Sequence, residues 1–400
     1  MELEEAVSLL KNALTPVKET ENCSVLEAAG RIAGADIFAP INVPSFAKSA
    51  MDGYAVRSED VYKASRESPV KLQVTGELFA GDSAMNIESG VNTAIRVMTG
   101  SPVPDGYDSV VKQEDTDYGE KTVSVYSPVK KWQNYCAVGE DIQKDELVLK
   151  TGTVINRSNI GLLSSLGIPE IKTIRKIRFS ILSTGSELIE SGSLLSPGKI
   201  YSSIAPMLSF SIKAAGQTVI KNKIIPDDEK EIATAIKNAA TESDVVITTG
   251  GVSVGKKDYL PAVLDSMGSK IIFERVKIQP GSPTRASLLN GKLILSLSGN
   301  PYAALANFDI YFYHILSILT GAVSLAPEKK TAELVSPYEK INKSRRLIRA
   351  FCDDGKVSLP AENHASSVIS NLTECNCYID LPKETVCKPG DKVSVWMMRI

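Results

Sequence analysis

Between residues 175 and 321, short apolar runs rich in β-branched residues alternate with segments of helical periodicity. The run from Val245 to Thr249 is apolar enough to be a strand buried on both faces, as strands in parallel sheets are. Ile177 to Leu182 and Thr218 to Ile225 read as further strands, and 204–215 and 229–242 read as helices between them. This alternation predicts a mainly parallel sheet covered by helices on both faces.

The end of this region contains a different signal. Asn290-Gly291 is a strong hairpin signal that joins Ala286–Leu289 to Leu293–Leu297. Before it, we expect a helix that starts near Asp258 and then a strand over Lys270–Gln279. After it, Pro301 is suited to open a long helix that runs to Thr320.

Three loops at the ends of predicted strands are rich in Ser, Thr and Gly: 183–187, 248–255 and 298–301. Ligands of open α/β sheets bind beyond the carboxyl ends of the strands. A glycine turn before a helix presents backbone N–H groups that can hold an anion. Taken alone, Gly250-Gly251 is equally well a plain tight turn, but three such loops at one sheet edge favour a phosphorylated ligand.

Several acidic residues lie at turns or loop ends: Asp52, Asp141, Glu187, Asp228 and Asp258. Asp228 is most simply the N-cap of the helix over 229–242, and Asp258 could cap its own helix. Asp52 interrupts an apolar run and is harder to explain as surface decoration. Carboxylates beside a phosphate-binding edge suggest Mg²⁺, which is held by few carboxylates together with phosphate oxygens.

The remaining sequence divides into smaller domains. Helical periodicity covers 2–14, 24–36 and 157–167, and short alternating strands fill the region from about 69 to 150. We therefore expect a multidomain α/β plus β protein, with an inserted β domain and a small C-terminal β domain. The predicted parts are a helical or linker domain (1–56 and 151–174), the inserted β domain (57–150), the α/β domain (175–324) and the C-terminal domain (325–400).

Composition excludes several functions. The net charge of −2, with acids and bases mixed, argues against binding to nucleic acid or to a membrane surface. The apolar stretch 302–319 contains Asn307, Asp309 and His314, so it reads as a buried helix and not as a membrane span. Six cysteines and two histidines form no disulfide framework or zinc set. We expect a cytoplasmic protein.

A set of motifs resembles one enzyme family, the molybdopterin molybdenumtransferases, which include the E domain of gephyrin. They occur in order across nearly all of the chain. The motifs are Ser49-Ala-Met-Asp-Gly-Tyr-Ala-Val-Arg57, Arg96-Val-Met-Thr-Gly-Ser-Pro-Val-Pro104, Val138-Gly-Glu-Asp-Ile142, Ser183-Thr-Gly-Ser-Glu-Leu188, Thr249-Gly-Gly-Val-Ser-Val-Gly255 and Gly299-Asn-Pro301.

The resemblance implies an elongated homodimer of four-domain subunits. The implied reaction is the Mg²⁺-dependent insertion of molybdate into adenylylated molybdopterin, with release of AMP. The α/β domain would bind the pterin nucleotide and face the inserted β domain of the partner subunit. Other proteins of molybdenum cofactor biosynthesis would be further partners.

The resemblance also assigns roles to residues. The implied catalytic residues are Asp52, Thr99, Asp141, Glu187, Asp228 and Asp258, of which the last three would hold Mg²⁺. The implied ligand-binding residues are Thr184, Gly185, Thr249, Gly250, Gly251, Ser253, Gly255, Gln279, Ser282, Arg285, Gly299, Asn300 and Ser366. One of Arg345, Arg346 and Arg349 would also reach the site.

One loop departs from the family pattern. Typical members carry Lys-Pro-Gly-Lys-Pro where this chain has Gln279-Pro-Gly-Ser-Pro283. Because a charge-assisted hydrogen bond contributes about 1.5–3 kcal/mol, the loss of two lysines is not conservative. Arg285, Lys256 or Lys257 could compensate.

Two alternatives to the transferase stay open. One is a non-catalytic paralogue that binds a pterin or nucleotide or acts as a scaffold, as the missing lysines allow. The other is a protein that uses the same domain on another nucleotide, as the related nicotinamide-nucleotide amidases do. The motif around Asp52 and the inserted β domain count against the second.

Overall fold

The computed structural model describes residues 1–85, 87, 89–252, 258–360 and 365–399. The predictions made for Ser253, Gly255, Lys256 and Lys257 lie outside these residues. The chain forms two compact units, which are described separately. The first unit comprises Met1–Ala35, Gly152–Asn156 and Ile171–Ile400, and the second comprises Asp36–Thr151 and Arg157–Glu170.

The first unit contains a six-stranded sheet with the order β15-β12-β16-β20-β19-β17. Its strands are β12 (Arg178–Thr184), β15 (Thr218–Ile225), β16 (Val245–Thr249), β17 (Lys270–Glu274), β19 (Arg285–Leu289) and β20 (Lys292–Leu297). The first four strands in this order are parallel, and β19 pairs antiparallel with both β20 and β17. The predicted parallel sheet and the hairpin at Asn290-Gly291 are therefore confirmed.

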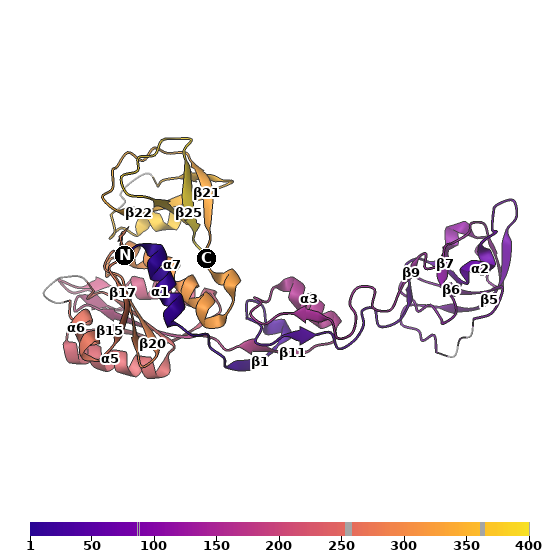
Figure 1. Ribbon diagram of the computed structural model, residues 1–400, viewed down its shortest axis with the longest axis horizontal. Helices are drawn as coiled ribbons and strands as arrows, with labels where there is room; N and C mark the ends of the chain where they lie inside the picture. Colours follow the sequence, from indigo (N-terminus) through magenta and orange to yellow (C-terminus); the bar gives the residue numbers. More distant parts are fainter. Residues whose placement is uncertain (86, 88, 253–257, 361–364, 400) are drawn as a thin grey trace. The chain divides into compact units, whose positions relative to one another are not determined.

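Helices cover both faces of this sheet (Figure 1). They are α1 (Leu3–Ala13), α4 (Ile204–Ala214), α5 (Glu229–Glu242), α6 (Leu260–Ser266) and α7 (Pro301–Thr320). Side chains alternate along each central strand: Val245 and Ile247 pack with α1, α4 and α7, whereas Val246 packs with α5 and α6. The continuous apolar sequence of β16 follows from burial on both faces.

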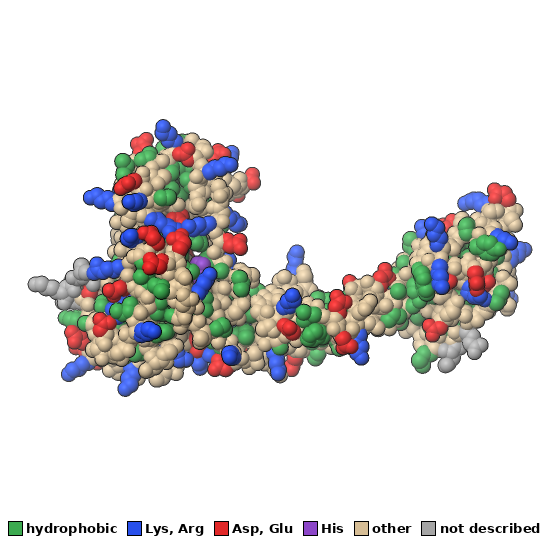
Figure 2. All heavy atoms as spheres, in the orientation of Figure 1, with side chains coloured by type: hydrophobic (Ala, Val, Ile, Leu, Met, Phe, Trp, Pro, Cys, Tyr) green, Lys and Arg blue, Asp and Glu red, His purple; other side chains and the backbone are tan. Residues whose placement is uncertain are grey.

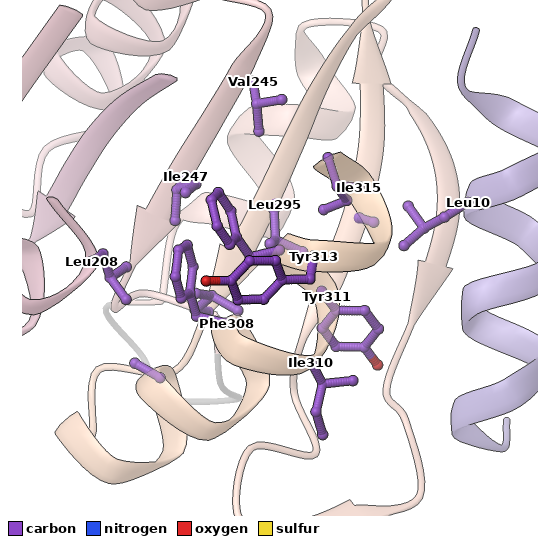
Figure 3. Close-up of a cluster of buried hydrophobic side chains, with 14 of the residues drawn as sticks. Leu10, Leu208, Val245, Ile247, Leu295, Phe308, Ile310, Tyr311, Tyr313 and Ile315 are labelled. Atoms are coloured by element: carbon purple, nitrogen blue, oxygen red, sulfur yellow. The ribbon is translucent and has the colours of Figure 1, made fainter. Parts of the chain in front are cut away.

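Helix α7 forms the centre of the larger core. Phe308, Tyr311 and Ile315 lie among Val245, Ile247, Leu295 and other side chains of the sheet (Figure 3). By length and composition α7 could cross a membrane, but 72% of its apolar window is buried inside the protein. Its apolar character is therefore explained by the protein interior.

The C-terminal β domain has its own core. Its strands are β21 (Lys329–Leu334), β22 (Arg345–Asp353), β23 (Lys356–Ser358), β24 (Cys377–Leu381) and β25 (Lys392–Met397), to which β18 (Ile278–Gln279) adds an edge. Arg345 of β22 bonds Asp380 at 2.6 Å and Glu4 of α1 at 2.8 Å. The hydrogen bond from Arg345 lowers the pKa of Glu4 to about 2, so this carboxylate stays charged and ties α1 to the C-terminal sheet.

The second unit is built on a five-stranded sheet, β7-β4-β6-β5-β8. Its strands are β4 (Gly53–Val56), β5 (Val70–Leu78), β6 (Thr93–Val97), β7 (Ser109–Lys112) and β8 (Thr122–Val125). The smaller elements of the unit are β2 (Ile37–Phe38), β3 (Lys48–Ser49), α2 (Ser58–Val61), β9 (Tyr135–Cys136), β10 (Leu147–Leu149) and α3 (Arg157–Ser165). Because β4 pairs with both β6 and β7, the inserted β domain begins before the predicted boundary at residue 57.

Three further sequence predictions differ from the structure. The predicted helix over 24–36 is wrong: only Val25–Glu27 forms a short 3₁₀ turn, and Ile32 and Ala33 form bridges to Val154 and Thr173. The predicted strand over Lys270–Gln279 is broken at Arg275, which has a φ of 57°. Residues 3–13 form a helix as predicted, but α1 packs into the α/β core and not into a separate linker domain.

Replacement of Asp309 by Asn should alter how stability depends on pH. Burial raises the pKa of Asp309 on α7 to about 7, although its carboxylate accepts a 2.6 Å bond from the Tyr378 hydroxyl. The folded state therefore keeps a proton that the unfolded state loses near pH 4. The free energy of unfolding that this proton contributes is lost as the pH rises from about 4 through about 7. Because Asp309 keeps some contact with solvent, we expect Asp309→Asn to gain about 2 kcal/mol relative to the wild type between pH 5 and 8.

The measurement is thermal unfolding by calorimetry at pH 5 and pH 8. The control is Asp353→Asn, an exposed acid of β22, which should leave the pH dependence unchanged. An equal difference between Asp309→Asn and the wild type at both pH values would contradict this interpretation.

Candidate functional site

A pocket of about 810 Å³ lies at the carboxyl edge of the six-stranded sheet. All three strand-end loops predicted from the sequence contribute to its wall. The predicted residues that line it are Thr184, Gly185, Glu187, Thr249, Gly250, Gly251, Asp258, Gln279, Ser282, Gly299, Asn300 and Ser366. Strands β12, β16 and β20 are parallel neighbours, so their carboxyl ends meet at this edge.

The loops approach one another so closely that side chains are excluded. A Cβ atom on Gly250 would overlap the carbonyl oxygen of Thr184, and Gly250 has a φ of +87°. A Cβ atom on Gly299 would come within 3.3 Å of the Cα atom of Gly250. Gly250 is therefore required both for conformation and for space, and Gly299 packs tightly against it.

Hydrogen bonds between the loops hold their geometry. The Thr184 hydroxyl donates to the Thr249 carbonyl at 3.2 Å, and the Thr249 hydroxyl bonds Ser183 at 3.1 Å. The Gly250 N–H donates to the Leu297 carbonyl at 3.1 Å. These side chains are used within the wall, so we expect backbone N–H groups and the start of α7 to face a ligand. The N-terminus of a helix favours an anion.

Asp227 and Asp228, two adjacent aspartates that follow β15, make different contacts. Asp228 caps α5, because its carboxylate accepts bonds from the N–H groups of Lys230 and Glu231. Asp227 lines the pocket, and its carboxylate accepts a 3.0 Å bond from the N–H of Ser186. The structure thus gives Asp228 a capping contact and brings Asp227, which the sequence analysis missed, to the pocket.

The loop from Gln279 to Pro283 forms one wall of the pocket and is held from below by α7. Asn307, which is buried, donates from its side-chain amide to the Pro280 carbonyl at 2.9 Å. Its amide also lies so close to Gly281 that no side chain would fit there. Gln279 and Ser282 are exposed, so this wall presents neutral polar groups.

Of the arginines named from the sequence, Arg346 lines the pocket. Arg345 is bound by Asp380 and Glu4, and Arg285 lies outside this pocket, where it bonds Asp265 at 2.5 Å and Glu274 at 3.5 Å. Arg285 is therefore not placed to replace the missing lysines.

Arg349 has a supporting role. It is buried, stacks on the Tyr302 ring at 3.8 Å and donates to the Ala365 and Val368 carbonyls at 2.6 and 2.5 Å. The Ser366 carbonyl in turn accepts a 3.1 Å bond from the Tyr302 N–H. These contacts position Ser366 in the pocket wall, whereas Arg349 itself lies outside the lining.

Carboxylates of the pocket supply oxygen ligands of the kind that Mg²⁺ prefers. Within the described part of the chain, no three His, Cys, Asp or Glu side chains come together as a metal-binding group. Glu187 and Asp258 nevertheless line the same pocket. Mg²⁺ is commonly held by one or two carboxylates together with substrate phosphates, so this pair fits such an ion.

The second unit contains the other predicted acids. Asp52 and Thr99, both named as site residues from the sequence, are in contact: one carboxylate oxygen of Asp52 accepts from both the N–H and the hydroxyl of Thr99, each at 2.8 Å. Both hydrogen bonds lower the pKa of Asp52. Asp141 is exposed in a loop, where its N–H donates to the Val43 carbonyl. These three residues belong to a different unit from the strand-end pocket.

Comparison with known families assigns almost the whole chain. Residues 1–167 match the MoeA N-terminal region (domains I and II), and residues 180–317 match a probable molybdopterin binding domain. Residues 331–398 match the MoeA C-terminal region (domain IV).

Individual relatives agree. The chain is 35% identical over 387 residues to a molybdopterin molybdenumtransferase of Staphylococcus epidermidis, with 96% of this chain and 92% of the relative covered. It is 33% identical over 359 residues to one of Staphylococcus aureus, with 89% and 85% covered. The crystal structure of the molybdopterin biosynthesis moeA protein of Pyrococcus horikoshii has a TM-score of 0.85 at 28% identity and covers 99% of each chain. The chain therefore belongs to the molybdopterin molybdenumtransferase family, a family of transferases in molybdenum cofactor biosynthesis.

Proposed function

We propose that this protein inserts molybdate into adenylylated molybdopterin in a Mg²⁺-dependent reaction that releases AMP. The observation that carries the proposal is the strand-end pocket, where glycine loops, the start of α7 and three carboxylates line one cavity. Its volume of about 810 Å³ lies within the range of small-molecule sites.

The described residues would divide the work. The N–H of Gly250 is bonded to the Leu297 carbonyl and the N–H of Asn300 to the Ser298 hydroxyl. The N–H groups of Gly251 and Gly299 in the same loops would therefore bind phosphate oxygens, and Arg346 would supply the cationic side chain. Glu187 and Asp258 would hold Mg²⁺ against the phosphates. When bound, the ion would screen the anions and polarise the phosphoanhydride for displacement.

Asp52 and Thr99 would complete the site from a second copy of the chain. We infer a homodimer because the family resemblance implies one, in which the inserted β domain of one subunit faces the α/β domain of the other. The carboxylate of Asp52 has its Thr99 side occupied by two hydrogen bonds, which fixes its orientation. It would then position water or molybdate. We place the reaction in the cytoplasm, in keeping with six unpaired cysteines.

A second candidate is a protein that binds the pterin nucleotide without turnover. It is favoured by the neutral side chains of Gln279 and Ser282 in a pocket that also contains the acids Glu187, Asp227 and Asp258. Arg346 is the cationic side chain in the described part of its lining. An anionic ligand would therefore depend strongly on backbone N–H groups and on Mg²⁺.

The first test replaces Asp52 by Asn in the full-length protein. The amide oxygen can still accept both bonds from Thr99, so the change removes charge and keeps local structure. We expect the rate of AMP release to fall by about 100-fold or more, with binding of the pterin nucleotide changed little. The measurement is AMP release from adenylylated molybdopterin with molybdate and Mg²⁺.

The chain offers a matched control in Asp36→Asn. One carboxylate oxygen of Asp36 accepts from the N–H and hydroxyl of Thr151, each at 2.8 Å, and its pKa is lowered for the same reason. This variant should retain wild-type activity. Equal losses in both variants would show that the motif is structural, and no loss in Asp52→Asn would remove Asp52 from the reaction.

Metal removal tests the role of Glu187. Treatment with EDTA should abolish AMP release, and added Mg²⁺ should restore it. Glu187→Gln should raise the Mg²⁺ concentration needed for half-maximal activity by about tenfold or more, because one oxygen ligand loses its charge. Full activity in EDTA would reject the Mg²⁺ requirement, and an unchanged Mg²⁺ response in the variant would remove Glu187 from the ion.

Introduction of lysines at 279 and 282 separates the two candidate functions. If the protein is a transferase, the wild type releases AMP, and Gln279→Lys with Ser282→Lys lowers the KM for the pterin nucleotide about tenfold or more through charge-assisted bonds. The matched control, Gln279→Met with Ser282→Ala, should not lower it. An inactive wild type that gains turnover with the lysines would instead favour the non-catalytic paralogue.

A further inference from the structure

A second cavity, of about 1040 Å³, lies behind the wall formed by the Gln279–Ser282 loop. It is bordered by α1, β18 and the strands of the C-terminal β domain, and it shares Gln279 and Ser282 with the strand-end pocket. We call it the lysine groove, after its six cationic side chains: Lys277, Lys329, Lys343, Arg345, Lys383 and Lys392. Figure 2 shows Lys, Arg, Asp and Glu side chains gathered where α1 meets the C-terminal domain.

The three carboxylates of the groove are all engaged by part of this cationic set. Glu2 pairs with Lys277 at 3.3 Å. Glu4 pairs with Arg345 at 2.8 Å and with Lys329 at 3.3 Å. Asp380 pairs with the same two bases, at 2.6 and 3.0 Å. The acids are thus neutralised within a fixed network and leave little negative charge for other cations.

Three lysines stay outside this network. Lys343, Lys383 and Lys392 are exposed, and none of them forms an ion pair with the residues that the structure describes. Like charges that line one concavity raise the local concentration of anions, because the low-dielectric walls focus the field. On an open surface, by contrast, exposed lysines are separated by water and screened by salt.

A hydrogen-bonding group adds to the charge. The Ser344 hydroxyl lines the groove, is shielded from solvent and has no partner among the described residues. A buried hydroxyl without a partner costs free energy that a ligand oxygen could recover. Ser282 contributes a further hydroxyl from the shared wall. Ammonium groups and hydroxyls together are the donor set that recognises an oxyanion.

We propose that the lysine groove is a second anion-binding site, which takes a small, multiply charged tetrahedral oxyanion through Lys343, Lys383, Lys392 and Ser344. The Gln279–Ser282 loop, which belongs to both cavities, links this site to the strand-end pocket. The groove binds the oxyanion whether or not the protein turns over a pterin nucleotide, so the two proposals can fail separately.

The test is isothermal titration calorimetry on the full-length protein at constant ionic strength, without pterin substrate. Phosphate, sulfate and molybdate are titrated in separate experiments, with chloride as the monovalent comparison. The wild type should bind at least one of the three oxyanions in preference to chloride. The triple variant Lys343→Ala, Lys383→Ala, Lys392→Ala should weaken that binding by about tenfold or more, because each charge-assisted bond contributes to affinity.

A control variant removes the same charge elsewhere. Lys213, Lys223 and Lys237 are exposed and lie outside both cavities, and their replacement by Ala should change the affinity less than about twofold. Ser344→Ala, which leaves the net charge unchanged, should weaken binding severalfold with no loss of thermal stability. The proposal is overturned if no oxyanion binds more tightly than chloride, or if the control and groove triple variants weaken binding equally.

Asp52→Asn distinguishes this site from the transferase reaction. Asp52 is not among the residues that line the groove, so the variant should bind phosphate and sulfate as the wild type does, even where it no longer releases AMP. Loss of phosphate and sulfate binding in Asp52→Asn would place the measured site elsewhere and overturn the assignment to the groove.

Discussion

The exclusion of side chains where three strand-end loops meet is the constraint on which the pocket depends. Gly250 packs against the Thr184 carbonyl and against Gly299, so the turns after β12, β16 and β20 form one continuous floor. This contact is possible only because those strands are parallel neighbours in the sheet. The hydroxyls of Thr184 and Thr249 then bond within the floor. A ligand therefore meets peptide groups held in place by the fold, which is the form of preorganisation that gives backbone anion sites their selectivity.

The placement of charge around this floor follows from helix ends. Asp228 is used to cap α5 and leaves its neighbour Asp227 free to face the pocket, where Ser186 orients it. At α7 the capping residue Asn300 makes no side-chain cap bond, and Pro301 occupies the first turn. The start of this long helix thus keeps its favourable interaction with negative charge. The carboxylates of Glu187 and Asp258 repel an anionic ligand unless a cation binds together with it. The combination makes a divalent ion and a phosphate more compatible with the pocket together than either is alone.

The sequence predicted correctly those helices and strands whose structure is determined by their own residues. The alternation of apolar runs and helices predicted β12, β15, β16, α4, α5 and α7, and glycine loops at their ends predicted the pocket floor. Prediction failed where partners are distant in sequence. Residues 24–36 have helical periodicity, yet Ile32 and Ala33 form bridges with Val154 and Thr173, more than one hundred residues away. Likewise, β4 was placed outside the β domain because its partners β6 and β7 cannot be identified from spacing alone. The sequence correctly predicted Asp228 as the N-cap of α5, but it did not show that Asp227 faces the pocket, because that placement depends on a bond with Ser186, 41 residues away.

The Gln279–Ser282 loop forms part of the wall of both cavities. Its backbone is fixed from α7 by Asn307, whose amide holds the Pro280 carbonyl and occupies the space beside Gly281. Gln279 at the start of the loop also belongs to β18, which pairs with β22, the strand that carries Arg345 and Arg346. Those two neighbours face different cavities: Arg346 lines the strand-end pocket and Arg345 the lysine groove. Successive side chains of a strand point to opposite sides. Arg345 and Arg346, which are adjacent on β22, therefore face the two different cavities. Because the loop itself is neutral, an anion in either cavity would depend on bases that the C-terminal domain supplies, such as Arg346 in the strand-end pocket and Lys343 in the lysine groove.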